Sequence, residues 1–152
     1  MDIKSGLITK TALEHLIFLS GKNIIEVCRT LQITPQQFTD WTKKRRPIPQ
    51  QRLDELTAYF GVEADTLADE KRFARNLSSL SAIELELFVV KNLAKISSTK
   101  DEEEELSFRS KQLKDEYEKQ LRITRLSVLL ERNDPVLMSK IDAFLDETEQ
   151  NL

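Results

Sequence analysis

Apolar residues recur every three to four positions along most of the chain, which is the spacing of amphipathic helices. The first predicted helix begins at Thr9 or Thr11, whose hydroxyl can cap it, and runs to about Ser20. Leu13, Leu16 and Ile17 share one face, and Gly21 follows the end, where glycine is common.

Four further short helices are predicted before residue 68. Asn23 can cap the second, and the third has Thr34 as its cap, Pro35 in its first position and Gln37 three residues after the cap. The expected ranges are Ile24–Leu31, Thr34–Lys43, Pro49–Phe60 and a last helix from about Asp65.

The second half of the chain also has helical periodicity. Ala68–Leu77 is expected to extend the first half as a helix, and Ser81 is expected to start the next. The residues from Ile83 to Ile96 are apolar nearly all round, so that helix should be buried. A long helix capped by Thr99 and a final helix after Asn133 complete the prediction.

The resulting organisation is all-α. We expect a five-helix domain in residues 1–68, a helical linker in 69–80 and a helical oligomerisation domain in 81–152. The composition agrees, because 3 glycines, 4 prolines and 32% charged residues in 152 favour long helices. It disfavours a β-sandwich, a collagen-like chain and a wholly disordered one.

The residue inventory argues against several functions. One cysteine and one histidine can form neither an internal disulfide nor a structural zinc site. We find no paired catalytic constellation and no glycine-rich phosphate loop, so we expect no enzyme activity, no metal and no cofactor. We also find no signal peptide and no apolar run long enough to span a membrane. This favours a cytoplasmic protein without membrane partners.

The net charge of −3 is unevenly distributed. Residues 1–67 carry a net charge of +1, and residues 68–152 carry −4. The basic character gathers in one run, Lys43–Arg46. Such a run is ordinarily a solvated surface, unless its surroundings give it a partner.

Only Gln32–Thr34 separate the second and third predicted helices, which is the spacing of a helix-turn-helix. The pattern Val27-Cys28, Ile33-Thr34, Phe38-Thr39 and Trp41 resembles the lambda-repressor-like (XRE/Cro-type) DNA-binding domains, over roughly residues 10–68. Arg46-Pro47, Leu53, Leu56, Phe60-Gly61-Val62 and Asp65-Thr66-Leu67 continue the likeness. The sequence departs from the family at Gln32, where the tight turn usually has glycine because it needs a positive φ.

The resemblance implies that the helix Thr34–Lys43 enters the major groove of double-stranded DNA. Gln36, Gln37 and Thr39 would read bases. The predicted phosphate contacts are Asn23, Thr34, Lys43, Lys44, Arg45 and Arg46. Asp40 could accept from cytosine or orient Lys43 or Lys44, and we assign it no base contact.

The apolar content of the second half exceeds what a helical hairpin covers, which favours a homo-oligomer of two or more copies. An intramolecular bundle is the alternative. The expected oligomer interface contains Leu87, Phe88, Leu113, Tyr117, Leu121, Val128 and Leu129.

Together these features predict a nucleoid-associated transcriptional regulator that reads operator half-sites. The resemblance favours a repressor from a bacterium, phage or mobile element, and leaves open whether a protein anti-repressor is a partner. The alternative is a helical protein-interaction module, an antitoxin-like or anti-repressor adaptor, which does not read DNA.

Overall fold

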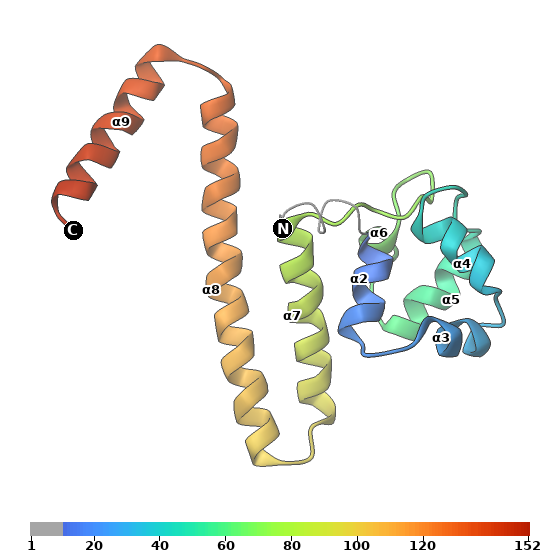
Figure 1. Cartoon of the computed structure of the whole chain (residues 1–152). Helices are drawn as coiled ribbons and strands as arrows, with labels where there is room; N and C mark the ends of the chain where they lie inside the picture. Colours follow the sequence, from blue (N-terminus) through green and yellow to red (C-terminus); the bar gives the residue numbers. More distant parts are fainter. Residues whose placement is uncertain (1–10) are drawn as a thin grey trace.

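The computed structural model describes residues 11–152, and this part of the chain consists of α-helices joined by turns and loops (Figure 1). The predicted all-α class is confirmed. The helices are α2 (Ala12–Leu19), α3 (Ile24–Thr30), α4 (Pro35–Thr42), α5 (Gln50–Phe60), α6 (Ala64–Leu67), α7 (Ser79–Ile96), α8 (Lys100–Glu131) and α9 (Pro135–Gln150).

Side-chain caps start the first helices where the sequence predicts them. Thr11 accepts from the backbone N–H of Glu14 and caps α2; the alternative cap, Thr9, lies outside the described residues. Asn23 caps α3 by accepting from the N–H of Ile25 at 2.9 Å. Thr34 and Gln37 form a reciprocal capping box at the start of α4.

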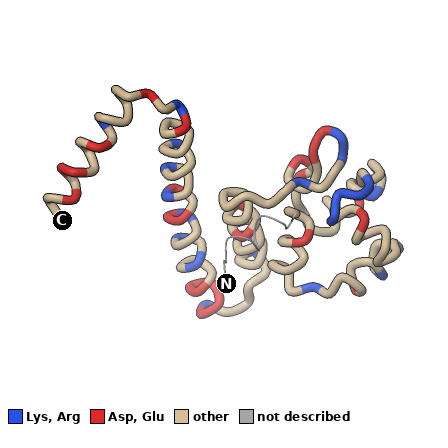
Figure 2. Tube along the Cα trace, turned by 45° about the horizontal axis from the view of Figure 1, so that its top comes forward, with Lys and Arg blue, Asp and Glu red and all other residues tan. Residues whose placement is uncertain are grey.

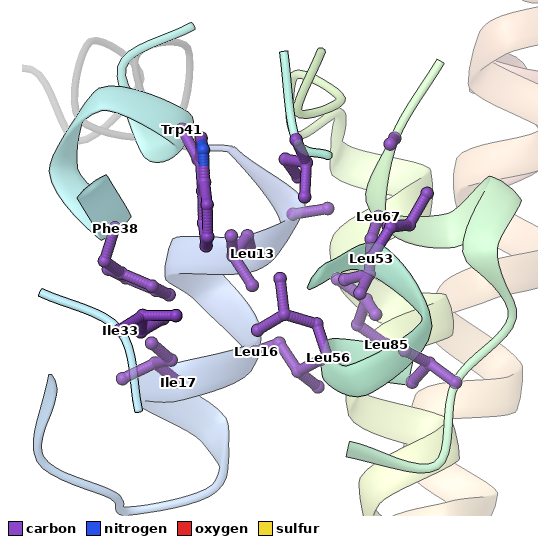
Figure 3. Close-up of a cluster of buried hydrophobic side chains, with 14 of the residues drawn as sticks. Leu13, Leu16, Ile17, Ile33, Phe38, Trp41, Leu53, Leu56, Leu67 and Leu85 are labelled. Atoms are coloured by element: carbon purple, nitrogen blue, oxygen red, sulfur yellow. The ribbon is translucent and has the colours of Figure 1, made fainter. Parts of the chain in front are cut away.

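One apolar cluster holds α2–α6 together (Figure 3). Its most deeply buried side chains include Leu13, Leu16, Phe38 and Leu56, all at most 1% exposed. Trp41 is 4% exposed and lies in the same cluster. Cys28 is also buried there, and its burial raises the pKa of the thiol.

The segment between α6 and α7 corrects the predicted helical linker, because residues 68–78 are not helical. Antiparallel bridges join Ala68 to Ala74 and Thr11 to Asn76. The segment therefore folds back on itself and crosses the start of α2. Pairing of Asn76 with Thr11, more than 60 positions away in the sequence, outweighs the local helix propensity of this segment.

Helix α7 packs against two parts of the molecule. Leu85 is buried in the first cluster, with Phe88 and Val89 packed against that cluster, whereas Ile83 and Val90 form a second cluster with Leu113 of α8. The expected burial of this helix is confirmed for Ile83, Leu85 and Val90, but Phe88 and Val89 are only half-buried and Ile96 at its end is 76% exposed. Its cap is Ser78, with Ser81 three residues later, and not Ser81 as predicted.

Helix α8 runs antiparallel to α7 and extends past it, and α9 points away from both (Figure 1). Asp134 caps α9, with Pro135 in its first position, so this helix begins after Asn133 as predicted. Residues 11–152 contain no helix with the length and apolarity needed to cross a membrane.

Gln32 occupies the turn between α3 and α4 with φ of 51°, so this turn does require the left-handed conformation. This conformation strains any residue that has a side chain by about 1–2 kcal/mol. Glycine avoids the strain, but its greater conformational entropy in the unfolded chain offsets part of the gain. We expect Gln32→Gly to raise the free energy of unfolding by about 1 kcal/mol. Urea unfolding followed by Trp41 fluorescence measures this. Gln51→Gly in helix α5 is the control and should destabilise; equal effects of both changes would contradict the strain argument.

Candidate nucleic-acid interface

The turn between α3 and α4 is fixed from both sides. Ile33 is buried, and its N–H donates to the carbonyl of Cys28 at 3.0 Å. Arg52 of α5 donates to the carbonyl of Leu31 at 3.0 Å and to the carboxylate of Glu55 at 2.6 Å. The Arg52 hydrogen bond lowers the pKa of Glu55. Arg52 thus supports the turn, a role that no local pattern indicates.

Helix α4 buries one side and exposes the other. Phe38 and Trp41 face the first cluster, while Pro35, Gln36 and Gln37 in the first turn are exposed. The core therefore anchors one side of α4. The exposed amide groups of its first turn can contact the surface or groove of another molecule.

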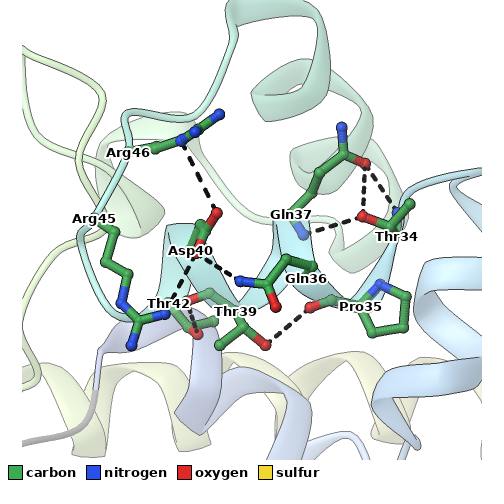
Figure 4. Close-up of polar contacts among 9 residues, drawn as sticks. All are labelled: Thr34, Pro35, Gln36, Gln37, Thr39, Asp40, Thr42, Arg45 and Arg46. Carbon is green, nitrogen blue, oxygen red and sulfur yellow. Dashed lines mark hydrogen bonds and ion pairs between the residues drawn. The ribbon is translucent and has the colours of Figure 1, made fainter.

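Gln37 is already engaged in the structure (Figure 4). Its Oε1 accepts from the backbone N–H of Thr34 at 2.9 Å and from the Thr34 hydroxyl at 3.2 Å. A bidentate contact with adenine needs both the oxygen and the nitrogen of the amide. While the capping box stays closed, Gln37 can therefore offer a base only its NH2 group.

Gln36 and Thr39 also make intrahelical bonds. The Gln36 Nε2 donates to Asp40 Oδ1 at 3.0 Å, which leaves the Gln36 oxygen as its accessible acceptor. The Thr39 hydroxyl donates to the carbonyl of Pro35 at 2.8 Å, so it can still accept. Thr39 is half-buried and lies at the edge of a groove with Ile24 and Lys43.

Asp40 organises the basic run (Figure 4). Its carboxylate lies 3.5 Å from Arg45 and 3.9 Å from Arg46, and its carbonyl accepts from the N–H groups of both. One expected alternative is that Asp40 orients Lys43 or Lys44. Its partners are Arg45 and Arg46 instead, because the chain turns at Lys44 and places both arginines next to Asp40. The two guanidinium groups remain more than half exposed.

Of the remaining predicted phosphate-binding residues, Lys43 and Lys44 lie around this turn and Asn23 lies at the start of α3, while Thr34 caps α4 and has its hydroxyl engaged with Gln37. Lys43 and Lys44 are exposed, and Lys44 has φ of 56° directly after the C-cap of α4. The Lys44 Nζ donates to Asn76 Oδ1 at 3.4 Å. Asn23 is exposed, but its side-chain oxygen is engaged as a cap, so a phosphate there would meet backbone N–H groups and the Asn23 NH2.

The structure adds two basic residues that the sequence analysis missed, Lys71 and Arg72. The Ile48 N–H donates to the Arg72 carbonyl at 2.8 Å, which brings this loop beside the basic run. Figure 2 shows both basic segments on the same part of the first domain. Asp69 fixes the loop by accepting from the N–H groups of Lys71 and Phe73. The wrongly predicted helix at 69–80 concealed this proximity.

The predicted oligomer residues fall into two groups. Leu113 is 1% exposed inside the second cluster, with Leu87 and Tyr117 packed against it, and Phe88 packs on the first cluster. Leu113 is therefore wrong as an interface residue, because the α7–α8 hairpin already covers it.

Tyr117 donates to the Glu84 carboxylate at 3.1 Å, which raises the pKa of the phenol. This bond also ties α8 to α7 inside one chain. The other predicted interface residues lie at the far end of α8, where Leu121 is half-buried, Val128 is 52% exposed and Leu129 is 36% exposed.

Comparison of the chain with protein-family models, curated proteins and solved structures finds no match.

Proposed function

We propose that this protein is a sequence-specific transcriptional regulator that binds double-stranded DNA with α3 and α4 as a helix-turn-helix of the lambda-repressor-like type. One observation carries this proposal. The exposed amides in the first turn of α4 lie on the same surface as the cationic Lys43–Arg46 run, whose arginines pair with Asp40. Amides discriminate base edges in the major groove, and arginine and lysine bind phosphates.

The geometry supports this assignment in three ways. Helix α4 has eight residues, about 12 Å, and the core anchors its inner side, so its outer side can enter a groove as a rigid element. The exposed Lys43–Arg46 run follows directly, where the rim of the groove would lie. Lys71 and Arg72 lengthen the same cationic surface, and we assign them phosphate contacts as well.

Regulation would follow from occupancy of an operator, and repression is the simplest consequence of covering a promoter. One small domain contacts few base pairs, and proteins of this kind commonly read two half-sites about one helical turn apart. We therefore assign self-association to the C-terminal helices. A regulator bound to chromosomal DNA would be nucleoid-associated.

Selection of bound sequences from a random double-stranded pool by the full chain tests this proposal. An enriched motif with two-fold symmetry is the expected result. Failure to enrich any sequence, with native Trp41 fluorescence and helical circular dichroism intact, would contradict DNA reading. That result would favour the protein-interaction module, whose partner would cover the same face of α4.

Gln37→Glu separates base reading from helix capping. Glutamate also completes a capping box and suits the positive end of α4, so stability should change by less than about 0.5 kcal/mol. Loss of the amide donor and repulsion from DNA should weaken binding to the selected site by about 1–3 kcal/mol. Fluorescence anisotropy with selected and scrambled duplexes measures the change; equal losses on both duplexes would show that Gln37 reads no base. Gln50→Glu, at an exposed position at the start of α5, is the charge-matched control.

A further inference from the structure

The C-terminal part of α8 projects beyond its partner helix. The start of α7 at Ser79 lies level with Glu116 and Gln120, which line the same pocket. Residues 121–132, here called the α8 overhang, extend further, as Figure 1 shows. Five of its apolar side chains are 36–52% exposed: Ile123, Leu126, Val128, Leu129 and Leu130. Nothing in residues 11–152 buries this apolar surface.

Helix α9 also exposes apolar side chains. It has 16 residues and none is buried, and Val136, Phe144 and Leu145 are 65%, 66% and 45% exposed. An isolated helix of about this length is marginal in water, because helices gain most of their stability from packing an apolar face. Leu137, Ile141, Phe144 and Leu145 follow helical spacing and form such a face, of which Leu137 and Ile141 are half-buried while Phe144 and Leu145 are exposed.

The two surfaces have opposite charge (Figure 2). The α8 overhang carries three arginines and one glutamate, whereas α9 carries four acidic residues and one lysine. Arg122, Arg125 and Arg132 lie on one side of the overhang by their spacing. Asp142, Asp146 and Glu149 likewise form one stripe, beside the apolar face of α9. The apolar face of α9 is thus bordered by an acidic stripe, whereas the arginines of the α8 overhang lie among its exposed apolar residues, so the two surfaces carry opposite charges.

We propose that α9 of one copy packs on the α8 overhang of a second copy, and that the reciprocal contact closes a two-fold dimer. A two-fold axis buries both apolar surfaces at once and leaves no open end. The lengths agree, since the overhang spans about 18 Å and α9 about 24 Å. This proposal rests on the self-association included in the proposed function and specifies its residues.

The connection between the helices favours a partner in the second copy. Only Arg132, Asn133 and Asp134 join α8 to α9. Asn133 has φ of 51°, and Asp134 accepts from the N–H groups of Val136 and Leu137. This capped link directs α9 away from its own α8 (Figure 1). The Arg122–Glu118 contact at 3.2 Å is exposed, so a stronger partner can displace it.

Charge reversal tests the pairing in the full chain. The double variants Arg122→Glu/Arg125→Glu and Asp142→Lys/Asp146→Lys should each raise the dimer dissociation constant at least about tenfold, because attraction becomes repulsion at both symmetric contacts. Sedimentation equilibrium measures this. Lys114→Glu/Lys119→Glu, on the exposed proximal part of α8, changes the net charge as much as the arginine variant and should leave the constant unchanged.

Mixing the two reversed variants distinguishes pairing between copies from pairing within one chain. In a mixed dimer, both contacts regain opposite charges, so native mass spectrometry should find the heterodimer in clear excess over either homodimer. Pairing of α9 with its own α8 cannot be rescued by mixing, and a mixture without heterodimers would overturn the proposal.

Two further results are decisive and are distinguishable. Dimerisation that is insensitive to both reversals would overturn the α9 pairing but leave self-association intact. A monomeric wild-type chain at all concentrations would overturn self-association as well, whereas the DNA selection tests the other half of the proposed function independently.

Discussion

Phe38→Ala is expected to lower the free energy of unfolding of the first domain by about 3–5 kcal/mol. Phe38 is 1% exposed and is among the largest fully buried side chains. Alanine would leave a cavity between α4 and the helices beneath it. Because domains are stable by only about 5–15 kcal/mol, this loss removes a large share of the total.

Urea unfolding followed by fluorescence measures the effect, because Trp41 is the only tryptophan and lies in the same cluster. Phe108→Ala provides the matched control, since Phe108 is 64% exposed on α8 and should cost less than about 0.5 kcal/mol. A loss below 1 kcal/mol for Phe38→Ala would contradict the packing of α4 on the first apolar cluster.

Replacing Lys43, Lys44, Arg45 and Arg46 together by alanine should cause the largest loss of DNA binding. Each neutralised phosphate contributes about 0.9 to the slope of log K against log salt, so the four changes should reduce the slope by about 3–4 units. Affinity at low salt should fall about a thousandfold or more for specific and random DNA alike, because phosphate contacts are insensitive to sequence.

Anisotropy titrations at several salt concentrations measure both quantities. The charge-matched control replaces Lys91, Lys95, Lys114 and Lys119, which are exposed on α7 and α8, and should change the slope by less than one unit. Equal slopes for the two quadruple variants would show that the Lys43–Arg46 run does not contact phosphates.

Features of the fold that depend on neighbouring residues could be predicted, whereas those that depend on distant residues could not. The caps Thr11, Asn23 and Thr34 act within three residues of their own position, so a local pattern reveals them. The strained turn at Gln32 also follows from a local rule, because a tight turn demands positive φ whatever residue occupies it.

The basic run shows the opposite case. Its composition is visible in the sequence, but its organisation by Asp40 and its extension by Lys71 and Arg72 depend on where the chain returns. Helical periodicity at 68–77 is satisfied equally by a helix and by an irregular segment with buried Ala74 and Leu77. Pairing of Thr11 with Asn76 decides between them, and sequence spacing carries no information about it.

The sequence by itself therefore determined the all-α class, the starts of most helices and the location of the cationic run, because periodicity, caps and charge are local properties. Tertiary structure decided which apolar residues are covered. Leu113 and Val128 both lie on the same helical stripe of α8. Helix α7 covers Leu113 but does not extend far enough along α8 to cover Val128. Burial depends on the length and placement of a neighbouring element, which no single helix encodes.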